Sequence, residues 1–125
     1  MSSDIQSTFI TAAAIDADGI SVAAAVADDA NLVLGGALTS GGAVTFDEPR
    51  NITILSAGDD SGISFTVTGT DEQGDAATES ITGANAGTAT GSAFFTTVTQ
   101  IAAVGDPAGN VSAGSGASIA APIFK

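Results

Sequence analysis

Hydrophobic and polar residues alternate with a period of two along much of the chain. Ile63, Phe65 and Val67 alternate with Ser and Thr, and Ile20, Val22, Ala24 and Val26 are spaced in the same way. This alternation predicts β-strands with one buried face, because successive side chains of a strand point to opposite sides. We predict strands near residues 8–15, 20–27, 31–38, 43–46, 50–56, 63–69, 76–82, 88–95, 97–104, 110–113 and 117–121.

Clusters of Gly, Asp and Asn separate these runs at intervals of about ten residues. Examples are Asp16–Gly19, Gly58–Gly62 and Asp71–Asp75. Gly accepts a positive φ, and Asp and Asn side chains bond back to their own backbone, so such clusters predict turns. The pattern predicts an all-β fold, an antiparallel β-sandwich or barrel. Within it we predict a hairpin that pairs 51–56 with 63–69.

The length of 125 residues fits a single β domain, 1–125. Residues 1–8 are polar and are expected to form an N-terminal arm that orders on a partner. Residues 105–125 are rich in Gly, Ser and Ala, which is compatible with either an extended arm or a last strand pair. The first residues contain neither a basic region nor a long apolar one, so we expect no signal peptide. The alanines of 23–27 favour a helix by propensity, but their Val, Ile and Gly neighbours favour a strand.

The charge is strongly one-sided. The chain has 14 acidic residues and two basic residues, Arg50 and Lys125, for a net charge of −12. Nucleic acids and anionic membranes would be repelled, because binding to them depends on Lys and Arg. We therefore expect no nucleic-acid or membrane partner. The acidic residues are expected to keep the protein soluble.

Residues that usually perform catalysis are scarce. The chain has no His, Cys, Trp or Tyr, and its one Lys is the last residue. A Ser or Thr nucleophile needs a neighbouring base, and adjacent carboxylates in turns lack the apolar wall that raises the pKa of a catalytic acid. We predict that the chain is not an enzyme, has no catalytic residues and needs no cofactor.

Acidic loops offer oxygen ligands of the kind that Ca²⁺ prefers. Asp16–Gly19 and Gly58–Gly62 are the candidates, but neither fits the twelve-residue calcium loop that ends in Glu. We predict no metal site, with calcium binding by an acidic loop as the alternative.

Arg50 and the pair Phe94-Phe95 are candidate interface residues. Arg50 is the single interior cation, and it would either pair with Asp47 or Glu48 nearby or contact a carboxylate of a partner. Adjacent residues of a strand face opposite sides, so one Phe ring would enter the core. The other ring would then meet a second sheet or a neighbouring subunit.

The stretch from Val44 to about Gly114 resembles a β module of tailed-bacteriophage structural proteins. Its pattern reads P-R-x-I-T-I, S-G-I-x-F-T-V-x-G-T-D, E-x-I-T-G-x-N-A-G-T and F-x-x-V-x-x-I. The matching residues are Glu48–Ile54, Asp60–Asp71, Gln73–Asp75, Glu79–Gly87 and Phe95–Ile101. Residues 1–43 fall outside the resemblance.

A short, acidic, single-domain version of this module is similar to a capsid decoration (cement) protein. That resemblance implies a virion protein on the outer capsid surface, acting as a homotrimer that binds and stabilises the major capsid protein shell. It leaves a tail-tube, connector or fibre-base subunit as the alternative. An acidic Ca-dependent adhesin or carbohydrate-binding module is the alternative of another class, although the lack of Trp and Tyr disfavours sugar binding. The interface residues that we predict are Ile5, Phe9, Ile10, Arg50, Phe94 and Phe95.

Overall fold

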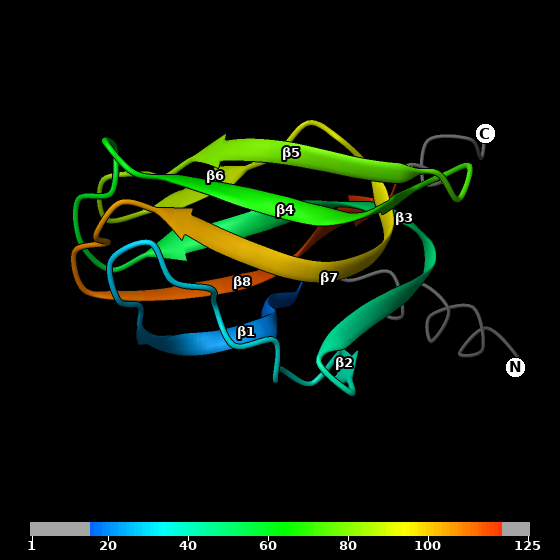
Figure 1. Cartoon of the computed structure of the whole chain (residues 1–125), viewed down its shortest axis with the longest axis horizontal. Coiled ribbons are helices and arrows are strands. Elements are labelled where there is room, and N and C mark those ends of the chain that lie inside the picture. Colours follow the sequence, from blue (N-terminus) through cyan, green and yellow to red (C-terminus); the bar gives the residue numbers. More distant parts are fainter. Residues whose placement is uncertain (1–15, 119–125) are drawn as a thin grey trace, which may run out of the picture.

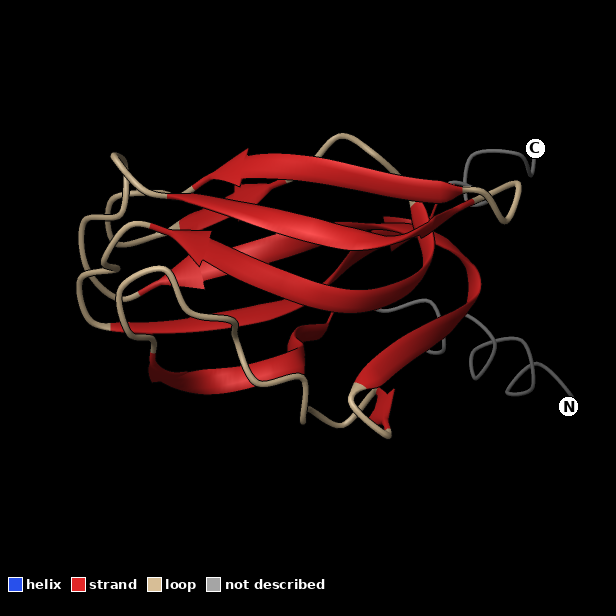
Figure 2. Cartoon of the chain, viewed as in Figure 1, coloured by secondary structure: helices blue, strands red, loops and turns tan. Residues whose placement is uncertain are grey.

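The computed structural model describes residues 16–118, which form an all-β domain of eight strands (Figures 1 and 2). The strands are β1 (Asp16–Ala25), β2 (Thr39–Ser40), β3 (Ala43–Ser56), β4 (Ser64–Asp71), β5 (Ala76–Thr82), β6 (Thr88–Thr90), β7 (Phe95–Val104) and β8 (Asn110–Ser118). This confirms the all-β class and the single domain. In this part of the chain there is no helix that could cross a membrane.

All strands belong to one antiparallel sheet, which nearly closes into a barrel (Figure 1). The strand order is β1-β8-β3-β7-β4-β5, and β2 and β6 also pair with β3. The long strand β3 makes this possible, because its first part pairs with β7 and its second part with β8 and β6. Its register shifts on either side of Arg50, next to Pro49, as expected where a strand bends from one wall to another.

Several predicted strand limits need correction. The predicted strands 43–46 and 50–56 are one continuous strand, β3, whereas 88–95 shrinks to β6. Residues 31–38 form a loop with a single β-bridge at Asn31. The prediction for 110–113 is extended to Ser118 by β8, and the predicted strand 8–15 lies outside the described residues.

The predicted hairpin of 51–56 with 63–69 is wrong. β4 pairs with β5 and β7, for example Phe65 with Ile81 and Ala103, and not with β3. The connection over residues 57–63 is long enough to cross the end of the barrel. There its Asp60 N–H donates to Ala84 O at 2.9 Å. Alternation thus identified the two strands but carried no information about their partners.

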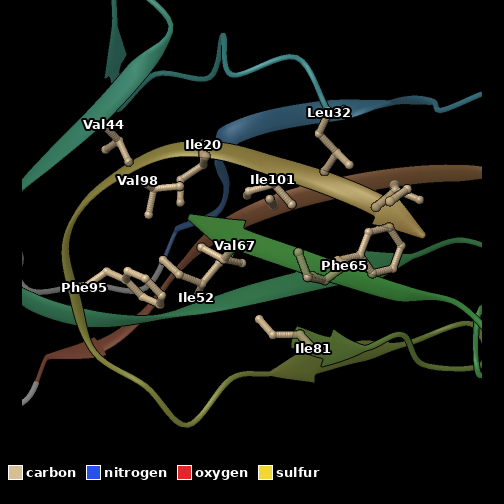
Figure 3. Packing of buried hydrophobic residues seen from close by; sticks show 14 residues of the cluster. Ile20, Leu32, Val44, Ile52, Phe65, Val67, Ile81, Phe95, Val98 and Ile101 are labelled. Carbon is tan, nitrogen blue, oxygen red and sulfur yellow. The ribbon is translucent and has the colours of Figure 1, made fainter. Parts of the chain in front are cut away.

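The core fills the barrel with side chains from β1, β3, β4, β5, β7 and β8 and from the loop that contains Leu32 (Figure 3). Phe65 and Val67 are fully buried, as their alternation predicts. The alternation of Ile20 with Val22 fails, since Ile20 is buried while Val22 is 56% exposed. The register of β1 against β8 slips between Ser21 and Ala24, and such a bulge re-aims the side chains. The buried hydrophobic residues are Ile20, Leu32, Val44, Ile52, Ile54, Phe65, Val67, Ile81, Phe95, Val98, Ile101, Ala103, Val111 and Ala113.

Candidate interaction surface

Arg50 lies inside the domain rather than on its surface. It sits where β3 passes between β7 and β8, with Phe95 and Ser118 as its Cα partners, and it is only 7% exposed. Its Nη1 donates to Gly116 O at 3.2 Å. The prediction of Arg50 as a contact for a partner is therefore corrected: the guanidinium holds β8 against β3. The side chains of residues 47–48 lie outside the described part, so the predicted ion pair stays a prediction.

The two adjacent phenylalanines separate as strand geometry requires. Phe95 is 0% exposed and belongs to the core, which corrects its prediction as an interface residue, while Phe94 is half-buried. Phe94 remains the member of the pair with a surface available for contact. Ile5, Phe9 and Ile10 lie outside the described residues.

Three loops converge at one end of the barrel, seen at the left of Figure 1. They join β3 to β4, β5 to β6 and β7 to β8. Asp60 is fully buried among them, and its Oδ1 accepts from Ala108 N–H at 2.7 Å. Ala86 N–H donates to Gly58 O at 2.7 Å. This end of the barrel is therefore held by its own main chain and by one buried carboxylate.

The exposed acidic turns bond to their own backbone. Asp59 Oδ1 accepts from the Ser61 hydroxyl at 2.6 Å and from the Ser61 N–H at 3.1 Å. The hydroxyl bond, followed by the amide bond, lowers the pKa of Asp59 from its usual value. Asp71 Oδ1 likewise accepts from the N–H groups of Gln73 and Asp75. Among the side chains that the structure describes, no group of three or more His, Cys, Asp or Glu residues is placed to hold a metal ion.

The loop of residues 26–38 closes the barrel between β7 and β1. On one side, Leu32 N–H donates to Ile101 O at 2.8 Å and Ala103 N–H donates to Ala30 O at 2.9 Å. On the other side, Gly36 N–H donates to Ile20 O at 3.0 Å, and Leu38 N–H donates to Gly19 O at 2.8 Å. This loop takes the place of a regular strand between β7 and β1.

Beyond Ile20 the loop no longer covers β1. Residues 22–25, here called the β1 edge, are all exposed and pair with β8 on one side. Among the described residues, no backbone hydrogen bond reaches them from the other side. Val22 on this edge, and Val33 and Leu38 on the loop beside β1, are 56%, 77% and 40% exposed.

The β1 edge is the candidate interaction surface, and sequence reasoning missed it. The signal was present in Ser21–Val26, a run of six residues without a charge or a proline. Open strand edges of folded proteins usually carry such blocking residues. An uncharged edge beside exposed apolar side chains is typical of a protein-binding surface.

The fold and this surface define a single-domain, all-β protein with a nearly closed antiparallel barrel. Comparisons with protein-family models, with curated proteins and with solved structures find no match to the chain.

Proposed function

We propose that this chain is a capsid decoration (cement) protein, a structural virion protein that acts by binding other proteins. In this proposal, it binds the outer face of the major capsid protein shell as a homotrimer and stabilises the shell without covalent bonds. The sequence resemblance to phage β modules supports the proposal. The resembling stretches Glu48–Ile54, Asp60–Asp71 and Phe95–Ile101 contribute half of β3, all of β4 and the first part of β7.

The observation that carries the proposal is the β1 edge with its apolar neighbours. On a chain of net charge −12, residues 22–25 form an uncharged surface, and on one side their main chain has no backbone hydrogen bond to any described residue. Strand addition to such an edge supplies affinity through main-chain hydrogen bonds. Val22, Val33 and Leu38 add apolar area for contact with a protein.

Strand addition at this edge would hold the copies of the homotrimer together, and decoration would repeat the contacts between trimer and shell many times. A shell presents the same binding site in many copies, so weak contacts that engage together give stable attachment. The exposed acidic side chains would keep the protein away from packaged DNA through charge repulsion. The Phe94 ring would provide further contacts with the shell, and the predicted N-terminal arm, with Ile5, Phe9 and Ile10, would provide contacts within the homotrimer.

The location and copy number of the chain in purified particles test the proposal. Virions are separated into DNA-filled heads and tails, and the chain is quantified by mass spectrometry relative to the major capsid protein. We expect it on heads, in a fixed ratio to the shell protein. Recovery with tails alone would favour a tail-tube, connector or fibre-base subunit, and absence from particles would reject a virion role.

Reconstitution tests the stabilising action. Heads that lack the chain are mixed with purified protein, and the temperature of DNA release is measured. We expect the wild-type chain to raise this temperature and Val22→Asp to raise it less. Thr78→Asp, an exposed substitution on β5, is the matched control and should behave as wild type. Equal heat resistance with and without bound protein would contradict the proposal.

A further inference from the structure

We propose that residues 5–15 of one copy add as a strand to the β1 edge, Val22–Ala25, of a second copy. The inference deepens the oligomer contained in the proposed function. It concerns contacts between copies of this chain and stands whether or not the assembly binds a capsid. The occupant is the N-terminal segment that precedes Asp16.

The edge is chemically suited to strand addition. Its four residues are Val and Ala, all exposed, with β8 on one side and no described backbone partner on the other. The β5 edge, at the opposite end of the strand order, differs. There the partly buried Glu79 carboxylate accepts from Ser92 N–H at 2.7 Å and from Ala93 N–H at 3.2 Å. An inward carboxylate of this kind blocks the pairing of a further strand, and residues 22–25 of the β1 edge include no charged residue.

The N-terminal segment has the matching chemistry. Residues 5–15 read IQSTFITAAAI, without a charge, a glycine or a proline, and 8–15 is a strand predicted from the sequence. An extended segment of eleven residues spans roughly 36–40 Å, more than the four residues of the edge require. Because the segment is uncharged, it approaches a partner of net charge −12 without adding repulsion.

Chain connectivity places this segment on a second copy rather than on its own β1. A hairpin onto residues 22–25 would need residues 16–21 as its turn, but these residues lie in β1, with Asp16 and Ser21 paired to β8. A parallel arrangement would need a crossover of about a dozen residues or more between the added strand and β1, and the segment 5–15 that would have to supply both is only eleven residues long. The loop at Gly36 and Leu38 also occupies the edge at Gly19 and Ile20.

Cysteine crosslinking tests the contact directly, because the chain has no cysteine of its own. Full-length Ser7→Cys, Thr8→Cys and Thr11→Cys chains are each mixed with full-length Ala24→Cys and oxidised. We expect disulfide-linked heterodimers for at least one arm position. The yield should be about tenfold or more above that with Gln73→Cys, an exposed control in the β4–β5 turn, because a docked arm raises the local thiol concentration.

Two results would overturn the inference. One is an equal yield with Ala24→Cys and Gln73→Cys for all three arm positions. The other is a disulfide that closes within a single chain when Thr11→Cys and Ala24→Cys are combined and diluted. A crosslink between copies without any binding to heads would keep this inference and reject decoration, so the two failures are distinguishable.

The oligomeric state gives an independent measurement. Sedimentation of the full chain, of a chain lacking residues 2–15 and of the Val22→Lys chain is compared, with circular dichroism to check folding. We expect the full chain to associate and the two variants to sediment as folded monomers. A peptide of residues 2–15 should bind the truncated chain and not the Val22→Lys chain. A full chain that is monomeric at high concentration, or a truncated chain that still associates, would overturn the inference.

Discussion

The barrel closes at two places, and each closure uses a different device. Between β5 and the segment that follows β6, the Glu79 side chain makes the closure: its Oε2 accepts from Ser92 N–H, Ser92 Oγ–H and Ala93 N–H. Between β7 and β1, the main chain of the 26–38 loop makes it, with Leu32 N–H and Gly36 N–H bonded to opposite strands. We call these the Glu79 seam and the loop seam.

The difference between the two seams determines which strand edge can accept a further strand. The Glu79 seam directs a carboxylate inward at the β5 edge, which discourages a further strand. The loop seam forms main-chain hydrogen bonds with β1 only at Gly19 and Ile20. Among the described residues, β8 is therefore the single backbone partner of residues 22–25. The surface available for association is therefore a consequence of closing one seam with a short irregular loop.

The largest expected effect comes from removing the apolar anchor of the loop seam. Leu32 is 5% exposed and packs in the core, so Leu32→Ala is expected to lower the free energy of unfolding by about 3 kcal/mol, as for other buried leucines. Val33→Ala is the matched control, because its side chain is 77% exposed, and the change should stay within about 0.5 kcal/mol. Urea denaturation measures both variants, and equal losses would show that Leu32 does not anchor the seam.

A smaller effect is expected where the loop meets β1. A Cβ on Gly36 would collide with the carbonyl oxygens of Gly19 and Asp18, at 2.5 Å from the latter. Gly36→Ala should therefore cost about 2 kcal/mol of stability through overpacking.

The neighbouring glycine gives the control. At Gly35 the nearest atom to an added Cβ is Val33 Cγ1 at 3.7 Å, an ordinary contact. Gly35→Ala should raise the free energy of unfolding by about 0.5 kcal/mol, since it restricts the unfolded chain. If thermal denaturation showed that Gly36→Ala and Gly35→Ala both raise or both lower the stability, this account of the loop seam would be contradicted.

Substitutions of Glu79 are expected to lower the stability in proportion to the hydrogen bonds that they remove from the Glu79 seam. Glu79→Ala removes the acceptor of three hydrogen bonds and should cost about 1.5 kcal/mol, a value for bonds to a charged group. Glu79→Gln retains one acceptor oxygen and should cost about 0.5 kcal/mol. Hydrogen exchange at the N–H groups of Ser92 and Ala93 should accelerate in the same order. Protection that is unchanged in Glu79→Ala would reject the carboxylate as the closing group.

The sequence predicts the parts of this fold that depend on local pattern. Phe65 and Val67 are buried because a regular strand against a core repeats every two residues, and nothing near them breaks that repeat. The Asp71 turn was predictable for a similar reason, since its carboxylate bonds to amides two and four residues ahead. The all-β class follows from such short-range rules.

Features set by distant contacts could not be predicted in this way. Val22 faces outward because of a bulge against β8, and the sequence of β1 alone does not contain that register. Arg50 is buried because β3 bends between two strands more than forty residues away. The β1 edge has no second backbone partner among the described residues because the hydrogen bonds of the loop seam end at Ile20, which depends on where the 26–38 loop lies in space.

The smallest effects on stability are expected at two residues with a left-handed backbone conformation, one in a loop at the end of the barrel and one in the loop seam. Ala86, in the loop after β5, has φ of 50°, and Asp29, in the loop seam, has φ of 58°. Glycine relieves backbone strain at such positions, although it also makes the unfolded chain more flexible. Ala86→Gly loses no side-chain hydrogen bond and should stabilise the protein by about 0.5 kcal/mol, the net of these two effects.

Asp29→Gly should lower the stability of the protein, in contrast to Ala86→Gly. The Asp29 carboxylate accepts from Gly105 N–H at 2.8 Å, a bond that ties the loop seam to the end of β7, and glycine removes it. The loss of that bond should outweigh the relief at the backbone and leave a net destabilisation of about 0.5 kcal/mol. Asp29→Asn keeps the acceptor and should lie close to wild type in thermal denaturation. If Asp29→Gly were as stable as Ala86→Gly, the loop seam would depend on its main chain alone, and the carboxylate at Gly105 would contribute nothing to closing the barrel.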